Sequence, residues 1–320
     1  MKFYIGVEIG GTKQQVAVVS EDGAMTELLS EKVVLVSGAE DILNWLEGSL
    51  NTLLTKYPEI EAIGVGFGGI VETKNERLSK SVQVRGWENF RLKDWFEKRF
   101  NKRTVVVNDT VAGGYGELLY GTGKGFDKFF YTNIGTGIGG ATFIHGKPYD
   151  GTGYGSSYFG HTYVPVRNPK AVSQYEYFDK LENYCSGVAI EKRLRQEGYI
   201  PKDSLLYSLC GGNTSTVTCS MLANAANNGD SFALGEIESW AYVYSIAMSN
   251  YITLFSPERV AIGGGVANMG DLILKPVRKY VGRFVFNSAK GRYDIVQCKL
   301  LDDAVLVGAA MFARDGFHPL

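Results

Sequence analysis

Two glycine-rich segments of the chain share one layout, a strand followed by a tight turn and a second strand. The first covers residues 5–19 with its turn at Gly10-Gly11-Thr12, and the second covers residues 130–143 with its turn at Gly135-Thr136-Gly137. Turns of this composition offer open backbone N–H groups and a hydroxyl, which together can surround phosphate oxygens. Each turn alone is equally compatible with an ordinary hairpin. The two together favour a polyphosphate ligand.

A carboxylate stands where an apolar strand gives way to a helix. The run Val105-Val106-Val107 leads into Asn108-Asp109-Thr110, and open α/β sheets place ligand-contacting groups at this end of a strand. Asp109 or Thr110 can instead serve only as the cap of the helix. An aspartate is the usual acceptor of the hydroxyl proton in phosphoryl transfer to an alcohol, so the phosphate-type turns favour Asp109 as a general base.

Two segments match the GxGxxG pattern of dinucleotide sites, residues 64–69 and residues 135–140. In a dinucleotide site this pattern opens a helix, because the pyrophosphate lies at the helix N-terminus. Here the second segment leads into another strand, and the first leads into a short strand and a polar loop. A Rossmann-type dehydrogenase is therefore not expected.

The elements that position these residues alternate along the chain. β-branched apolar runs predict strands at residues 3–9, 14–19, 62–66, 104–107, 129–134, 141–144 and 260–262. Apolar residues at helical spacing predict helices at residues 39–57, 110–120, 182–196, 230–255 and 304–314. Strands and helices joined by glycine turns indicate an α/β fold.

Composition narrows the class of function. The 33 lysines and arginines nearly balance the 34 aspartates and glutamates, so no basic surface indicates nucleic acid and a small-molecule ligand is favoured. The four cysteines lack CxxC spacing and fit a reducing compartment better than a disulfide framework. Because neither a signal peptide nor a membrane-spanning run is evident, we expect a soluble cytoplasmic protein without membrane partners.

The motifs, taken together, resemble those of the ROK family of sugar kinases. In family order they are the first phosphate motif at Glu8-Ile-Gly10-Gly11-Thr12-Lys13, the catalytic pair Asn108-Asp109, the second phosphate motif at residues 134–140, the sugar segment Gly160-His161-Thr162, the sugar-helix start at Leu181-Glu182 with Ser186-Gly187, and the adenosine motif around Gly263-Gly264-Gly265. The resemblance covers residues 4–313. It implies ATP-dependent phosphorylation of a hexose or hexose derivative.

The resemblance also implies a role for each matching residue. Asp109 would be the general base, and the sugar would be bound by Gly69, Gln83, Asn108, Asp109, Tyr158, His161 and Glu182. ATP would be bound by Glu8, Gly10, Gly11, Thr12, Lys13, Gly135, Thr136, Gly137, Gly263, Gly264 and Gly265. Glu8 would hold Mg²⁺, directly or through a water molecule.

The chain departs from the family pattern at several positions. Glu8 stands where the family usually has aspartate, Tyr158 where it has a sugar-binding glutamate, Gln83 where it has asparagine, and Val111 replaces the second asparagine of the NDxN signature. Because unpaired buried hydroxyls cost roughly 1–3 kcal/mol each, the preferred sugar need not be glucose.

The cysteine cluster that gives most ROK kinases a zinc site is missing, since no cysteine stands between His161 and Glu182. One histidine cannot supply a tetrahedral site. The sequence therefore predicts no bound zinc.

The family resemblance further implies an actin-like ATPase fold of two ribonuclease-H-like lobes with an interlobe cleft. We expect an N-terminal lobe at residues 1–117, a larger lobe at residues 118–303, and a C-terminal helix at about residues 304–320 that packs back on the first lobe. A homodimer is the family expectation. The alternative function is a sugar-binding or regulatory protein without catalysis, and the absence of a DNA-binding segment before the first phosphate motif argues against a repressor.

Overall fold

The computed structural model describes residues 1–34, 38–75, 77–80, 84–153, 157–166 and 177–320. The chain is an α/β protein with two five-stranded sheets, which confirms the predicted fold class. Its contacts divide it into two compact units. Unit 1 is Met1–Tyr131, Gly140–Ser157 and Cys298–Leu320, and unit 2 is Thr132–Gly139 and Tyr158–Gln297. The predicted division into lobes near residue 117 stays a proposal.

The first sheet carries the first glycine turn and the predicted base. Its strand order is β3-β2-β1-β4-β7, with bounds β1 Phe3–Ile9, β2 Lys13–Ser20, β3 Met25–Lys32, β4 Ile60–Phe67 and β7 Arg103–Asn108. β1 pairs antiparallel with β2 and parallel with β4, which in turn pairs parallel with β7. A short hairpin follows β4, formed by β5 Ile70–Glu72 and β6 Arg77–Lys80.

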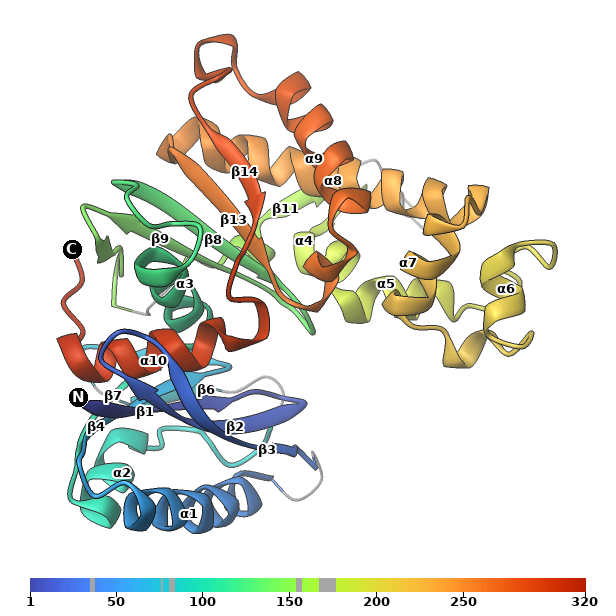
Figure 1. Ribbon diagram of the computed structural model, residues 1–320. Helices are drawn as coiled ribbons and strands as arrows, with labels where there is room; N and C mark the ends of the chain where they lie inside the picture. Colours follow the sequence, from blue (N-terminus) through green and yellow to red (C-terminus); the bar gives the residue numbers. More distant parts are fainter. Residues whose placement is uncertain (35–37, 76, 81–83, 154–156, 167–176) are drawn as a thin grey trace. The chain divides into compact units, whose positions relative to one another are not determined.

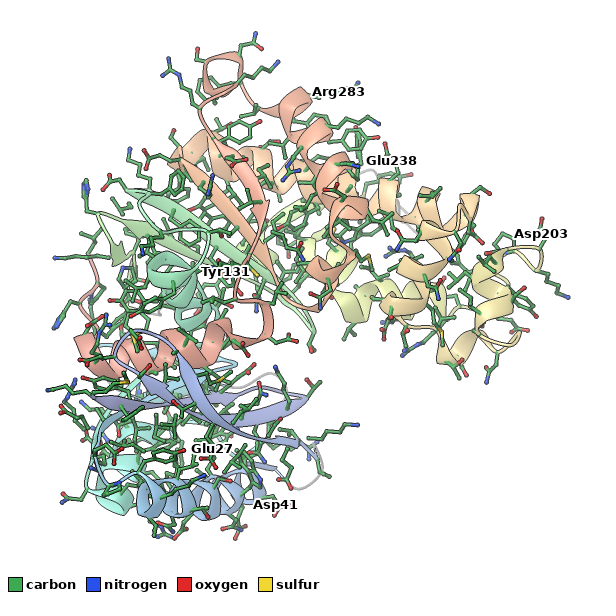
Figure 2. All side chains as sticks on the ribbon, in the orientation of Figure 1. Glu27, Asp41, Tyr131, Asp203, Glu238 and Arg283 are labelled. Atoms are coloured by element: carbon green, nitrogen blue, oxygen red, sulfur yellow. The ribbon has the colours of Figure 1, made fainter. Side chains whose placement is uncertain are left out.

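Helices cover both faces of this sheet (Figure 1). α1 Gly38–Lys56 and α2 Leu92–Phe100 lie on one face, and α10 Ala304–Asp315 lies on the other. The buried residues of α1 recur every three or four positions, so a single stripe of the helix packs on the sheet; they are Ala39, Ile42, Leu46, Leu50 and Leu53. Beyond this stripe, Glu27 of β3 bonds Lys56 and Tyr57 at the end of α1 (Figure 2).

Glycines allow α10 to lie directly on the strands. A Cβ on Gly64 of β4 would stand 1.7 Å from the backbone oxygen of Ala309, and one on Gly6 of β1 would stand 2.0 Å from that of Leu306. On its other side, α10 packs against α3 Asp109–Tyr120, where Gly308 faces the backbone of Ala112. Part of the high glycine content therefore serves backbone packing, and this packing fixes the helix that begins at the predicted base.

A buried carboxylate ties the end of α3 to the segment before α10. Glu117 is fully buried and accepts hydrogen bonds from the backbone N–H of Thr122, from the Thr122 hydroxyl and from the backbone N–H of Leu300. The segment that contains Leu300 continues into a short 3₁₀ turn, η6 Leu301–Asp303. Through these three hydrogen bonds the buried carboxylate holds both segments in place.

The second sheet has the strand order β10-β9-β8-β13-β14. Its strands are β8 Lys128–Ile134, β9 Ile138–Ile144, β10 Lys147–Pro148, β13 Arg259–Gly263 and β14 Asp294–Gln297. The second glycine turn, Gly135–Gly137, joins β8 to β9. Both predicted strand-turn-strand segments are therefore confirmed.

Most of unit 2 is helical. Its helices are α4 Leu181–Cys185, α5 Gly187–Leu194, α6 Leu205–Leu209, α7 Cys219–Asn227, α8 Ser231–Phe255 and α9 Asp271–Phe284, and a small hairpin is formed by β11 Tyr163–Pro165 and β12 Phe178–Lys180. α8 and α9 lie side by side, and Glu238 of α8 accepts hydrogen bonds from Lys279 and Tyr280 of α9 (Figure 2). In the described part of the chain, no helix is long and apolar enough to cross a membrane.

The single helix predicted at residues 182–196 is wrong. It is two helices, α4 and α5, because the backbone of Ser186 is extended, with ψ of 158°. The Ser186 hydroxyl accepts a hydrogen bond from the N–H of Ala189, so this residue ends one helix and caps the next. The apolar spacing continues across the break, which explains why periodicity alone did not reveal it.

Candidate functional site

The predicted pair Asn108-Asp109 lies at the junction of β7 and α3. The Asn108 side-chain oxygen faces the N–H groups of Thr110 at 3.0 Å and Val111 at 3.4 Å, which makes Asn108 the N-cap of α3. Its amide nitrogen donates to the backbone oxygen of Gly69 at 3.0 Å. Asn108, Asp109 and Gly69, three of the residues predicted to bind sugar, are thus brought together. Capping is performed by Asn108, and Asp109 is the first residue of the helix.

Gly68, which the sequence analysis did not single out, lies between Asp109 and the first glycine turn. A Cβ on Gly68 would stand 3.4 Å from a carboxylate oxygen of Asp109, 3.1 Å from the backbone oxygen of Ile9 and 3.4 Å from the Cα of Gly10. The Gly68 N–H donates to the oxygen of Ile9 at 2.8 Å. The glycines that follow β4 in the sequence indicate that some backbone comes close to them. The sequence does not show that the neighbours are the end of β1 and the start of α3.

Burial controls the charge of Asp109. It raises the pKa of this carboxyl from 3.8 to about 6, against the opposing effect of nearby donors, chiefly the N–H and hydroxyl of Thr110. The Thr110 N–H lies 2.7 Å from the Asp109 Oδ1. A carboxylate whose pKa lies just below neutrality is ionised at pH 7 and yet basic enough to accept a proton from an alcohol, as a general base requires.

Glu8, at the end of β1, is a second carboxylate of the same unit. Burial raises its pKa from 4.5 to about 7; Lys13 lowers it, and the charge of Asp109 raises it further. The Lys13 Nζ lies 3.5 Å from the Glu8 Oε2, and this buried oxygen accepts no hydrogen bond from a described residue. Once ionised, a carboxylate whose buried oxygen has no hydrogen-bond donor fits the hard oxygen ligand that Mg²⁺ prefers.

The two glycine turns present similar surfaces. Thr12 and Thr136, at the tips of the two turns, are both exposed. In the second turn, the Gly135 N–H bonds the Gly137 oxygen at 3.0 Å, and the Gly135 oxygen accepts from the N–H of Gly187 at 2.8 Å. These contacts fix the turn against the start of α5 within unit 2.

The predicted adenosine motif packs against the same turn. Gly264 has φ of +83°, a conformation that favours glycine. A Cβ on Gly264 would stand 2.6 Å from the backbone N and O of Ile134, at the end of β8. Gly265 then begins a 3₁₀ turn, η4 Gly265–Met269. The positive φ and the close approach of the Ile134 backbone both require glycine at position 264.

Unit 2 also brings His161 and Glu182 together. His161 ends the 3₁₀ turn η1 Phe159–His161, and its Nε2 lies 3.2 Å from the Glu182 Oε1. The other carboxylate oxygen of Glu182 lies 3.5 Å from the N–H of Ile138 and would be 3.1 Å from a Cβ on Gly137. The aromatic ring of Tyr158 meets the His161 ring edge to face at 5.9 Å between centroids. Three predicted sugar-binding side chains are thus neighbours.

The side chains that face the ring nitrogens of His161 do not form a zinc site. Its Nδ1 faces the ammonium of Lys180 at 3.3 Å, while Glu182 faces its Nε2, so both ring nitrogens have partners. In the ranges that the structure describes, no three His, Cys, Asp or Glu side chains gather as a metal site would require. Lys180 was not predicted, although its place directly before Leu181-Glu182 was a signal. The absence of zinc stays a prediction.

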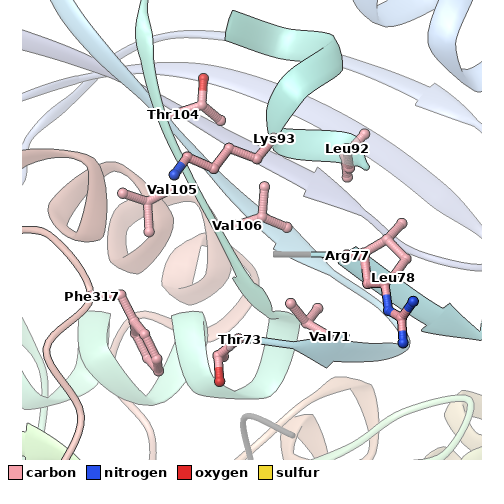
Figure 3. A pocket seen from close by; sticks show the side chains of 10 residues that line it. All are labelled: Val71, Thr73, Arg77, Leu78, Leu92, Lys93, Thr104, Val105, Val106 and Phe317. Atoms are coloured by element: carbon pink, nitrogen blue, oxygen red, sulfur yellow. The ribbon is translucent and has the colours of Figure 1, made fainter. Parts of the chain in front are cut away.

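One predicted residue, Gln83, lies outside the described residues. A cavity of about 240 Å³ elsewhere in unit 1 is lined by the β5–β6 hairpin, the start of α2, β7 and Phe317 (Figure 3). Its ten lining residues, all described, include none of the predicted site residues. Arg77 at its edge is paired with Glu72 at 2.8 Å. This cavity is distinct from the predicted site.

Comparison with known proteins shows similarity to one family over nearly the whole chain. Residues 4–316 match the model of the ROK family. The chain is 31% identical to a glucokinase of Thermotoga maritima over 97% of both chains, and 25% identical to a xylose repressor of Caldicellulosiruptor bescii over 86% of this chain and 69% of the repressor. A ROK family glucokinase from Streptomyces griseus, solved with glucose and AMPPNP, is 29% identical, with a TM-score of 0.83 over 98% of this chain and 100% of that one.

Proposed function

We propose that this chain, which belongs to the ROK family, is a kinase that transfers the terminal phosphate of ATP to a hydroxyl of a hexose or hexose derivative. The observation that carries the proposal is Asp109, a carboxylate at a strand end with a pKa raised to about 6, separated only by Gly68 from the first glycine turn. The similarity to glucokinases over nearly the whole chain supports the same reaction class.

In this proposal Asp109 accepts the proton of the attacking sugar hydroxyl. Asn108 holds the helix start through its two cap bonds and fixes Gly69 through its amide, so that the carboxylate keeps its direction. The pair therefore combines a base with the group that orients it, as proton transfer in a transition state requires.

The glycine turns bind the phosphates of ATP through backbone N–H groups and the hydroxyls of Thr12 and Thr136. Lys13 adds a positive charge beside Glu8. Glu8 holds Mg²⁺, directly or through water, which neutralises phosphate charge when bound. Gly263, Gly264 and Gly265 present an open backbone to adenosine, since the turn at Gly264 excludes a side chain.

His161, Glu182 and Tyr158 contact the sugar hydroxyls in this proposal, together with Gln83. Tyr158 is 38% exposed and is thus accessible to a ligand. A phenol offers one donor and one acceptor site, whereas a carboxylate accepts from two hydroxyls at once. We therefore propose a sugar other than glucose as the preferred substrate, and this distinguishes the chain from the glucokinases that it resembles.

A coupled assay of ADP release tests the proposal. Purified protein is supplied with ATP and Mg²⁺ and screened against hexoses, N-acetylhexosamines and ketoses, with a sugar-free reaction as the background. We expect turnover with at least one member of these classes. Sugar binding by calorimetry without ADP release from any of them would favour the non-catalytic alternative.

A further inference from the structure

Lys180 is the one basic side chain that the structure places against His161 among the described residues. It ends β12 and precedes α4, and its position is fixed by pairing with Tyr163 of β11. Its Nζ lies 3.3 Å from the Nδ1 of His161. Neither the sequence motifs nor the comparisons assign it a role.

The contact determines which nitrogen of His161 carries the proton. An ammonium has three donors and no acceptor, so the Nδ1 that faces it must offer a lone pair. The proton of the neutral ring then resides on Nε2, which lies 3.2 Å from the Glu182 Oε1 and donates to it. The opposite tautomer would set an N–H against the ammonium and leave Glu182 without this donor.

Two described groups favour the Nε2–H tautomer, Glu182 at Nε2 and Lys180 at Nδ1. Glu182 from α4 faces Nε2, and the Tyr158 ring, which precedes η1, meets the imidazole ring edge to face. The Asp179 carboxylate on β12 is bonded to the Asn183 side chain at 2.8 Å and to the Lys180 backbone N–H at 2.7 Å. Among these groups, Lys180 is the one that places a positive charge beside Nδ1.

We propose that Lys180 is a positioning residue for sugar binding: its ammonium holds His161 as the Nε2–H tautomer, and His161 in turn orients the Glu182 carboxylate. The contacts continue from Glu182 to the N–H of Ile138, the first residue of β9 in the second phosphate motif. Lys180 thus supplies the positive charge beside the Nδ1 of His161. The role in sugar binding rests on the proposed function, whereas the tautomer does not.

The tautomer is measured directly by long-range ¹H–¹⁵N correlation spectroscopy of the histidine rings at pH 8. The chain has three histidines, and a His161→Gln variant assigns the signal. We expect the Nε2–H pattern in the wild type, a shift toward mixed tautomers in Lys180→Met, and its recovery in Lys180→Arg. Lys192→Met, which removes an exposed lysine of α5, is the matched control and should leave the pattern unchanged.

Kinetics supply the second readout. Loss of one hydrogen bond to a charged group corresponds to about tenfold in affinity, so Lys180→Met should raise the sugar KM about tenfold and change kcat and the KM for ATP much less. An Nδ1–H pattern in the wild type would overturn the proposal without any variant. An unchanged tautomer and an unchanged sugar KM in Lys180→Met would overturn it as well. If the wild type phosphorylates no sugar, the proposed function fails, and the spectra still decide the tautomer.

Discussion

Replacing Asp109 by asparagine should remove turnover and stabilise the fold in the same variant. Asparagine keeps the shape of the side chain and can still accept from the Thr110 N–H, but it cannot accept the proton of a sugar hydroxyl. General-base catalysis contributes about 10²–10⁴-fold, so kcat should fall by about this factor while sugar affinity changes little.

The gain in stability follows from the raised pKa. Between the ordinary value of 3.8 and the folded value of about 6, the difference corresponds to about 3 kcal/mol. The folded state binds the proton more tightly than the unfolded state, so this carboxyl destabilises the fold increasingly as the pH rises from 3.8 through 6. Below 3.8 both states are protonated and the penalty vanishes. Asparagine, which stays neutral, should therefore be more stable by up to about 3 kcal/mol at pH 8.

Chemical denaturation at pH 5 and pH 8 measures this difference, and sugar-dependent ADP release at saturating substrates measures turnover. The stability gain should be larger at pH 8 by more than about 1 kcal/mol, because Asp109 is mostly protonated at pH 5 in the folded state. Asp203→Asn, which removes an exposed carboxylate in unit 2, is the control and should alter neither quantity. The wild-type kcat/KM should fall as the pH drops below about 6.

Two results would refute the reasoning separately. A variant that keeps more than about a tenth of wild-type turnover would defeat the general-base assignment. A variant whose stability matches the wild type at both pH values would show that burial does not raise the pKa of Asp109. The charge of Asp109 also raises the pKa of Glu8, so its removal should add to the gain and cannot mask it.

Three further predictions concern other residues. Tyr158→Glu should raise the ratio of kcat/KM for glucose to that for the best substrate, because it restores a bidentate acceptor; an unchanged ratio would mean that Tyr158 does not face the sugar. Elemental analysis of protein purified without added metal should find no stoichiometric zinc, since both nitrogens of His161 are engaged. Glu117→Ala should lower the free energy of unfolding by roughly 2–5 kcal/mol in urea denaturation, because three donors of Thr122 and Leu300 lose their acceptor; a loss below about 1 kcal/mol would contradict this role.

Local patterns were enough to predict most of the strands and to single out the candidate site residues. Glycine turns between β-branched runs specify strand-turn-strand segments by themselves, since turn geometry and strand propensity act over a few residues. The same holds for the Asn108-Asp109 junction, where an apolar strand meets a helix start. The break at Ser186 is a local feature too, but the serine cap competed with an apolar spacing that continued through it.

Contacts between segments distant in the sequence determine the neighbours and the charge of the candidate site residues. No pattern near Asp109 shows that Gly68 adjoins its carboxylate, and the raised pKa depends on burial by elements that follow and precede it by many residues. Likewise, the sequence marks His161 and Glu182 as candidates, whereas the pairing of β11 with β12 places Lys180 against the imidazole. Residue type and order determine which groups are available for catalysis. Their charge and proton positions are set by tertiary packing, because desolvation and hydrogen bonding act through space and not along the chain.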